Sequence, residues 1–239
     1  MYYSAWGAPE KREYAVGQVR LLAPVIAQRE ARAASLVSVV SQQLLEVGLS
    51  EDPLHAVLMV GVGTSNGWVA DVDARRTLFL ALELLPDPPF DRVLVTHEAV
   101  HTVQAGVDWP ATVAADLWRE GSATAFSRHL CPDLGDSAYL WFDDEHADWV
   151  RSCEADTQII TTMARDNIVN ADEAIVRGLF SLPDNSPIPH RAGYWLGDKL
   201  VSDLIASGAS APRLLGASYE EAVELACQWL ASDGRTEAS

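Results

Sequence analysis

Helical stretches and short strand-like runs alternate in the first half of the chain. The Ala- and Leu-rich stretch Leu21–Val47 predicts a helix, with Gly48 as its natural stop. The apolar runs Leu54–Val60 and Thr77–Leu84 predict two strands, and the turn dipeptide Asn66-Gly67 between them favours a hairpin. We therefore expect a long helix followed by a small, mainly antiparallel sheet.

Proline separates this part from a second, mainly helical part. The segment Leu85–Pro89 holds three prolines, which interrupt both helices and strands. Ser181–Pro189, also with three prolines, is expected to be a loop beside a cleft. The remaining pattern predicts helices over Asp91–Ala105, Ala111–Leu130, Ser137–Arg165 and Asp172–Leu179, and further helices from Arg191 and Tyr219. The expected class is α+β, with a mostly helical C-terminal half.

The helix expected over Asp91–Ala105 carries the pentapeptide His97-Glu98-Ala99-Val100-His101. Helix residues four apart lie on one face, so His97 and His101 would present two imidazoles to one metal ion. Glu98 would then reach a water molecule on that metal and act as general base. It is the only formally charged residue between Arg92 and Asp108, which is typical of a buried helix whose polar groups face a cleft.

Catalytic zinc usually has three protein ligands, so the pentapeptide requires a third. Glu120, 19 residues after His101, is the best candidate. Pro110 favours a new helix start, so two roughly antiparallel helices would bring Glu120 back to the histidines. Asp116, one turn earlier on the same face, is the alternative, either as the ligand or as a carboxylate that orients a ligand histidine.

Two families that share the pentapeptide are excluded. The metzincin pattern continues with a glycine and a third histidine, where this chain has Gln104 and Val107. Peptide deformylases use a cysteine ligand upstream of the pentapeptide, whereas the first cysteine here is Cys131, downstream.

His97-Glu98-x-x-His101 followed by Glu120 resembles the gluzincin metallopeptidases. The motif Glu120-Gly121-x-Ala123 is similar to one in a bacterial family of predicted zinc-dependent proteases of unknown function. Gly193-Tyr194-x-x-Gly197, within Ala192–Val201, resembles a C-terminal helix of the same family. The resemblance extends from about Leu54 to Val201.

The resemblance implies a zincin-like fold in which the sheet packs on the active-site helix. It implies a zinc site formed by His97, His101 and Glu120, and hydrolysis of a peptide bond with Glu98 as general base. Tyr194 is the candidate donor to the oxyanion, with His190 and Arg191 as alternatives. A peptide or protein is the expected substrate. The competing interpretations are a non-catalytic zinc-binding or regulatory module on the same scaffold, and a zinc amidohydrolase acting on a non-peptide amide.

Two further segments have alternative interpretations. Gly61–Gly67 lacks the Gly-Lys-Ser/Thr end of a phosphate loop and is better interpreted as part of a hairpin. In gluzincins such a strand pairs with the substrate, so the backbone of Gly61–Asn66 either does so here or forms an ordinary hairpin. The acidic cluster Asp143–His146 is either a second metal site or, as we expect, the solvated face of a helix.

Composition and charge indicate the domain organisation and exclude some classes of binding partner. The chain of 239 residues is 49% hydrophobic, which suits one domain, 1–239, with lobes of about 1–106 and 107–239 around a cleft. Its net charge of −17 disfavours binding to nucleic acid and to anionic membranes. No run of about 18 apolar residues predicts a membrane span. Met1–Arg20 lacks the apolar part of a signal peptide, and three separated cysteines suggest no disulfide framework, so we expect a cytoplasmic protein.

Overall fold

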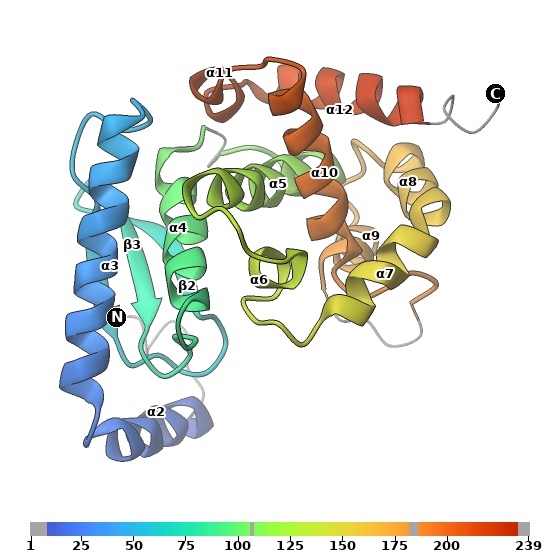
Figure 1. Ribbon diagram of the computed structural model, residues 1–239. Helices are drawn as coiled ribbons and strands as arrows, with labels where there is room; N and C mark the ends of the chain where they lie inside the picture. Colours follow the sequence, from blue (N-terminus) through green and yellow to red (C-terminus); the bar gives the residue numbers. More distant parts are fainter. Residues whose placement is uncertain (1–8, 106–107, 182–185, 234–239) are drawn as a thin grey trace. The chain divides into compact units, whose positions relative to one another are not determined.

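The computed structural model describes residues 9–105, 108–181 and 186–233, which form a mixed α+β structure (Figure 1). The α+β class is therefore confirmed. Contacts divide the chain into two compact units, Met1–Thr102 and Val103–Ser239. The first unit contains α2 (Pro9–Leu22), α3 (Ile26–Glu46), β1 (His55–Met59), β2 (Gly67–Val72), β3 (Arg75–Ala81) and most of α4 (Phe90–Val103). In the described part of the chain, no helix is long and apolar enough to cross a membrane.

The sheet of the first unit has the order β1-β3-β2 and is mixed. β1 runs parallel to β3, and β2 runs antiparallel to it. The expectation of a mainly antiparallel sheet, with a hairpin turn at Asn66-Gly67, was wrong. The hairpin joins β2 to β3 through Asp73 and Ala74, whose φ angles of 49° and 62° match the tight turns that favour hairpins. Gly67 is instead the first residue of β2.

α4 is a buried helix of the first unit, because every position from Val93 to Val100 is buried. Asp91, in its first turn, is fully buried and pairs with Arg32 of α3. A buried carboxylate needs such a partner, since removing its charge from water is costly. Arg29 of α3 also donates to the carbonyl of Leu82 at 2.7 Å. The Arg32–Asp91 pair thus joins α4 to α3, and Arg29 joins α3 to the segment that follows β3.

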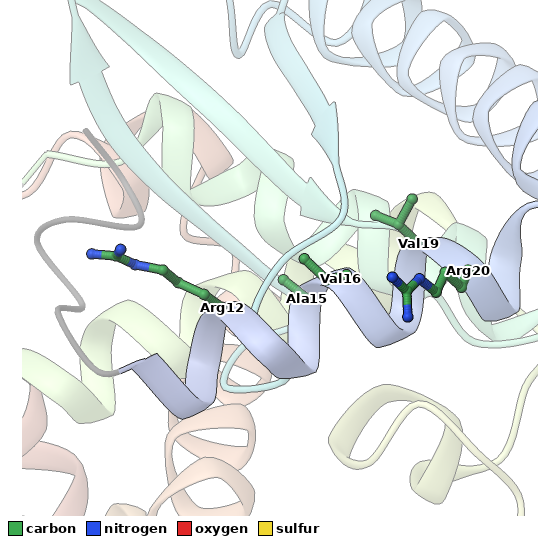
Figure 2. A pocket seen from close by; sticks show the side chains of 5 residues that line it. All are labelled: Arg12, Ala15, Val16, Val19 and Arg20. Carbon is green, nitrogen blue, oxygen red and sulfur yellow. The ribbon is translucent and has the colours of Figure 1, made fainter.

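A shallow feature of the first unit lies on α2. A pocket of about 440 Å³ is lined by Arg12, Ala15, Val16, Val19 and Arg20 (Figure 2). Val16 and Val19 are exposed, so this helix presents an apolar strip between two arginines.

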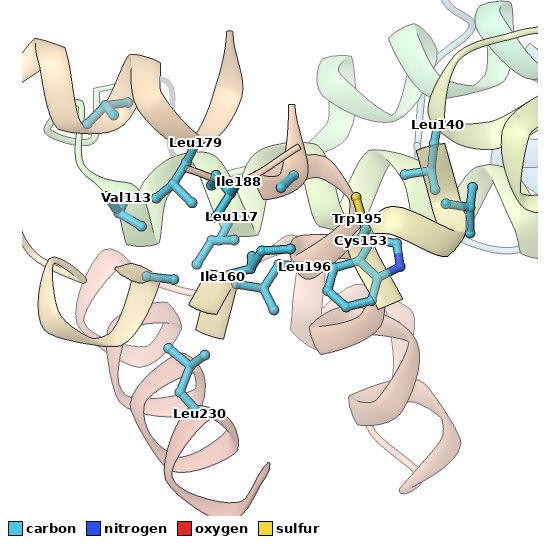
Figure 3. Close-up of a cluster of buried hydrophobic side chains, with 14 residues drawn as sticks. Val113, Leu117, Leu140, Cys153, Ile160, Leu179, Ile188, Trp195, Leu196 and Leu230 are labelled. Atoms are coloured by element: carbon cyan, nitrogen blue, oxygen red, sulfur yellow. The ribbon is translucent and has the colours of Figure 1, made fainter. Parts of the chain in front are cut away.

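The second unit is built around two helices that cross at very short distance. They are α5 (Val113–Leu130) and α10 (Ala192–Ala206). A Cβ atom at Gly121 of α5 would lie 2.3 Å from the carbonyl oxygen of Gly197 of α10. The remaining helices are α6 (Asp136–Leu140), α7 (Ala147–Ala155), α8 (Thr157–Asp166), α9 (Glu173–Phe180), α11 (Ala211–Leu215) and α12 (Tyr219–Asp233). Apolar side chains from seven of these helices, α5 to α10 and α12, meet in one core, and Figure 3 shows Leu117, Ile160, Leu179, Leu196 and Leu230 among them.

Two long predicted helices are divided in the structure. The stretch Leu21–Val47 is shared by α2 and α3, which are separated at residues 23–25 beside Pro24. Ser137–Arg165 forms α6, α7 and α8 rather than one helix. Part of the loop expected over Ser181–Pro189, residues 182–185, lies outside the described residues.

Candidate metal centre

α4 places two imidazoles side by side, one helical turn apart. The Nε2 atoms of His97 and His101 lie 3.3 Å apart, with the ring planes at 80° to one another. His97 is only 4% exposed and His101 is half-buried. The geometry follows from the spacing of four residues on a regular helix, as the sequence predicted.

Glu120 completes a group of three potential ligands. One ligand atom of each of His97, His101 and Glu120 lies within 4.8 Å of the others, so this group could hold a metal ion. Glu120 is half-buried on α5 and precedes Gly121, the residue at the crossing with α10. The close contact between these two helices fixes the turn of α5 on which Glu120 lies.

The distance between the two imidazoles agrees with a tetrahedral ion. Two nitrogens at about 2.05 Å from one zinc ion, in tetrahedral geometry, are about 3.3 Å apart. The observed Nε2–Nε2 distance is 3.3 Å. Two imidazoles and one carboxylate also form a common donor set of catalytic zinc sites. The residues present therefore fit the metal that the pentapeptide implies.

Glu98 is buried beside the ligand pair and lies directly against the sheet. Its exposed fraction is 8%. A Cβ atom added to Gly67, the first residue of β2, would lie 2.5 Å from Cγ of Glu98 and 2.8 Å from its Cδ. Only glycine at position 67 leaves space for this carboxylate. The dipeptide Asn66-Gly67 predicted a turn at Gly67, and nothing local in the sequence indicated the contact of Gly67 with Glu98.

Asp116, the alternative third ligand, is placed differently from Glu120. Its carboxylate pairs with Arg119 at 3.1 Å, one turn along α5. Burial raises the pKa of Asp116. The positive charge of Arg119 opposes this increase, and the negative charge of Glu120 adds to it. Among the described residues, the group of potential ligands contains Glu120 and not Asp116.

The three residues considered for the oxyanion lie at the start of α10. Tyr194 is half-buried, and its ring meets Phe180 edge-on, with the centroids 5.8 Å apart. His190 is exposed, and its carbonyl accepts a hydrogen bond from Trp149 Nε1 at 2.7 Å. Arg191 lies over the ring of Tyr194. Gly193 and Gly197, the glycines of the family-like segment, allow close packing against Phe180 and α5.

Some backbone amides of the loop at Gly61–Asn66 form hydrogen bonds within the protein. The amides of Gly61 and Gly63 donate to the carboxylate of Glu83, at 2.8 and 3.3 Å. Two of the backbone groups expected to pair with a substrate are thus already paired. The strand that lies against Glu98 is β2, which the pattern of apolar residues did not predict.

The acidic cluster at Asp143–His146 lies between α6 and α7 rather than on a helix face. Asp143 accepts hydrogen bonds from Ser137 at 2.9 Å and from the backbone of Glu145 at 3.0 Å, and its carboxylate lies 2.8 Å from the His146 ring. Burial tends to raise the pKa of Asp143, but the hydrogen bonds from His146, Ser137 and Glu145 outweigh it and lower this pKa. Such side-chain hydrogen bonds to nearby backbone compete with a helix and explain its interruption.

The cysteines carry no disulfide. Cys131, Cys153 and Cys227 are all free, and the first two are buried. Burial, with the nearby charges of Asp156 and Glu154, raises the pKa of the Cys153 thiol to about 12. A thiol that stays protonated at neutral pH is a poor nucleophile, which agrees with a structural role.

Comparison of the chain with protein-family models, curated proteins and solved structures finds no match. The resemblance to the gluzincins therefore rests on the motifs in the sequence.

Proposed function

We propose that this protein is a zinc-dependent peptidase of the gluzincin type, with a zincin-like fold. The observation that carries the proposal is the grouping of His97, His101 and Glu120 within 4.8 Å, on two helices separated along the chain. The buried Glu98, next to His97, supports a hydrolytic function because a metal-binding module needs no carboxylate at that position.

The roles of the residues follow from their positions. His97, His101 and Glu120 would hold zinc, which would supply a Lewis acid for a carbonyl group and lower the pKa of a water molecule to about 7. The carboxylate of Glu98 takes a proton from the attacking water and passes it to the nitrogen of the leaving amine. Tyr194 is proposed to donate its hydroxyl proton in a hydrogen bond to the developing oxyanion.

The edge of the sheet supports a peptide as substrate. β2 is an edge strand of the order β1-β3-β2, and its first residue lies against Glu98. The carbonyl of Asn66 accepts from the amide of Ala81, so strand alternation directs the peptide groups of Val69 and Asp71 away from β3. An extended peptide that added to this edge would bring its backbone past the general base.

The test combines metal analysis with turnover. The purified protein should contain about one zinc ion per chain and cleave members of a quenched fluorescent peptide library. Glu98→Gln should retain the zinc but lose at least about 100-fold in kcat, since it cannot accept a proton. Glu120→Gln should lose most of the zinc.

Asp116→Asn is the matched control, because Asp116 lies on the same helix one turn from Glu120. It should retain zinc. Loss of zinc in Asp116→Asn but not in Glu120→Gln would move the third ligand to Asp116. A Glu98→Gln variant with full turnover would contradict the mechanism, and zinc without peptide cleavage would favour a binding module or an amidohydrolase with another substrate.

A further inference from the structure

An arginine at the start of α10 is held between two aromatic rings. The Cζ atom of Arg191 lies 4.4 Å from the ring centroid of Trp141 and 4.4 Å from that of Tyr194. Trp141 is itself stacked on His146, with ring centroids 4.1 Å apart and planes 6° apart. Trp149 meets Trp141 edge-on at 5.3 Å. We call these five residues the Arg191 cluster; all belong to the second unit.

The backbone around Arg191 is also fixed. Arg191 has a φ of 60°, in the left-handed region that a non-glycine residue adopts at an energetic cost. Its amide donates to the carbonyl of Ser181 at 3.1 Å, and its carbonyl accepts from the amide of Tyr194 at 3.0 Å. The preceding residue, His190, is bound through its carbonyl by Trp149. The position of the Arg191 guanidinium is therefore fixed by the backbone hydrogen bonds around it and by the rings of Trp141 and Tyr194.

Arg191 makes no ion pair among the described residues of this acidic protein. Its half-buried side chain lies over the rings of Trp141 and Tyr194. The other described arginines of the second unit are each paired with a carboxylate: Arg119, Arg128, Arg151, Arg165, Arg177 and Arg213. Among the described residues of the second unit, Arg191 is therefore the arginine without a carboxylate partner.

The chemistry of the cluster favours a carboxylate ligand. Two aromatic rings lie against the guanidinium, whose N–H groups lie in its own plane. The edge of this plane matches the two oxygens of a carboxylate, which it can bind through two parallel hydrogen bonds.

The cluster lies near Glu120 along the two crossing helices. Arg191 precedes Gly197 by six residues, or about 9 Å along α10. Gly197 contacts Gly121, the neighbour of Glu120.

We infer that Arg191 binds a carboxylate of the substrate. This inference rests on the proposed peptidase function and specifies its substrate class. The carboxylate has two possible sources, the free C-terminus of a short peptide or an Asp or Glu side chain, and both present the same two oxygens to the guanidinium.

The experiment measures peptide binding without turnover. Zinc-loaded Glu98→Gln protein is titrated by calorimetry with acetyl-Ala-Ala-Ala as the free acid and as the C-terminal amide. It is also titrated with acetyl-Ala-Glu-Ala-amide and acetyl-Ala-Gln-Ala-amide. In one of these two pairs, the carboxylate peptide should bind about 10- to 100-fold more tightly, the range for hydrogen bonds between charged groups. The pair that shows the difference identifies the source of the carboxylate.

Variants of Arg191 assign this preference to the guanidinium. Arg191→Gln in the same background should abolish the preference for the carboxylate peptide. Arg191→Lys should retain only part of it, since lysine lacks the planar guanidinium that forms two parallel hydrogen bonds. Arg213→Gln, an exposed arginine paired with Glu221, is the control and should leave the preference unchanged. Equal thermal stability of the Lys variant and its parent shows that the fold is intact.

The results separate this inference from the proposed function. Equal binding of acid and amide in both pairs, or a preference that survives Arg191→Gln, would overturn the carboxylate site even if the protein is a zinc peptidase. A carboxylate preference that depends on Arg191 in a protein that binds no zinc would support the site while the peptidase function fails.

Discussion

At the scale of single residues, Gly67 decides where the general base can lie. Its Cα is so close to Glu98 that an added Cβ would approach Cγ to 2.5 Å. Carbon atoms do not pack at that distance, so any side chain at position 67 must displace Glu98 or β2. The role of Gly67 is to position Glu98, since it carries no reactive group.

Gly67→Ala should therefore affect activity and stability while the metal site remains filled. We expect zinc content to stay near one per chain, kcat to fall about 100-fold because the base is misplaced by about 1 Å, and stability to fall by about 1–3 kcal/mol. Elemental analysis, steady-state kinetics and urea unfolding measure the three effects.

The control is to make Gly67→Ala in a Glu98→Ala protein, which lacks the Cγ atom that the added Cβ would contact. The stability cost of Gly67→Ala should largely disappear in that background. An equal cost in both backgrounds would show that the glycine is needed for backbone conformation and not for the position of Glu98.

At the scale of elements, the crossing of α5 and α10 fixes the helix turn that carries Glu120. A Cβ atom on Gly197 would lie 2.5 Å from the carbonyl oxygen of Leu117, a backbone atom that cannot rotate away. Nearby, buried Asp198 of α10 is bound by Arg128 of α5 at 2.8 Å. Burial raises the pKa of Asp198, and the charge of Arg128 opposes this effect. The two helices are thus joined by close backbone contact and by a largely buried ion pair.

Gly197→Ala should separate these helices and weaken the metal site. We expect a loss of about 1–3 kcal/mol in unfolding free energy, together with lower zinc affinity because Glu120 follows the movement of α5. Gly17→Ala in α2 is the control. No atom lies within 4 Å of its added Cβ, so the better helix former should raise stability by about 0.5–1 kcal/mol. Chemical unfolding and zinc titration measure both changes, and a neutral Gly197→Ala would contradict the close crossing.

At the scale of the whole molecule, the proposed zinc ligands come from segments separated in sequence. His97 and His101 lie on α4 and Glu120 lies on α5. A metal held by both should favour the folded chain over the unfolded one, since the unfolded chain does not bring these ligands together.

Zinc should therefore raise the unfolding temperature, and a chelator should lower it. At free zinc 100-fold above the dissociation constant, the added stability is about 2.7 kcal/mol. Calorimetry of the protein with zinc and with EDTA measures the difference, which should be much smaller in Glu120→Gln. A parent protein whose unfolding temperature is insensitive to both would argue against a metal bound in the folded state.

Local features of this protein were determined by the sequence alone. The side-by-side histidines depend on a spacing of four residues, and the end of α3 depends on Gly48, whose φ of 71° suits glycine. The helix that carries the pentapeptide and the strand at His55–Met59 followed from apolar runs of the right length. Each of these features needs only neighbouring residues, so the sequence pattern contains them.

Other features were decided by tertiary structure. The parallel pairing of β1 with β3, the contact of Gly67 with Glu98 and the position of Arg191 between Trp141 and Tyr194 join residues far apart in the chain. Glu120 was named from the sequence as a candidate beside Asp116, and only the structure shows that the group of potential ligands contains Glu120. Such contacts depend on how complete elements pack, because a side chain's distant neighbours are set by the surfaces of those elements and not by its own local sequence.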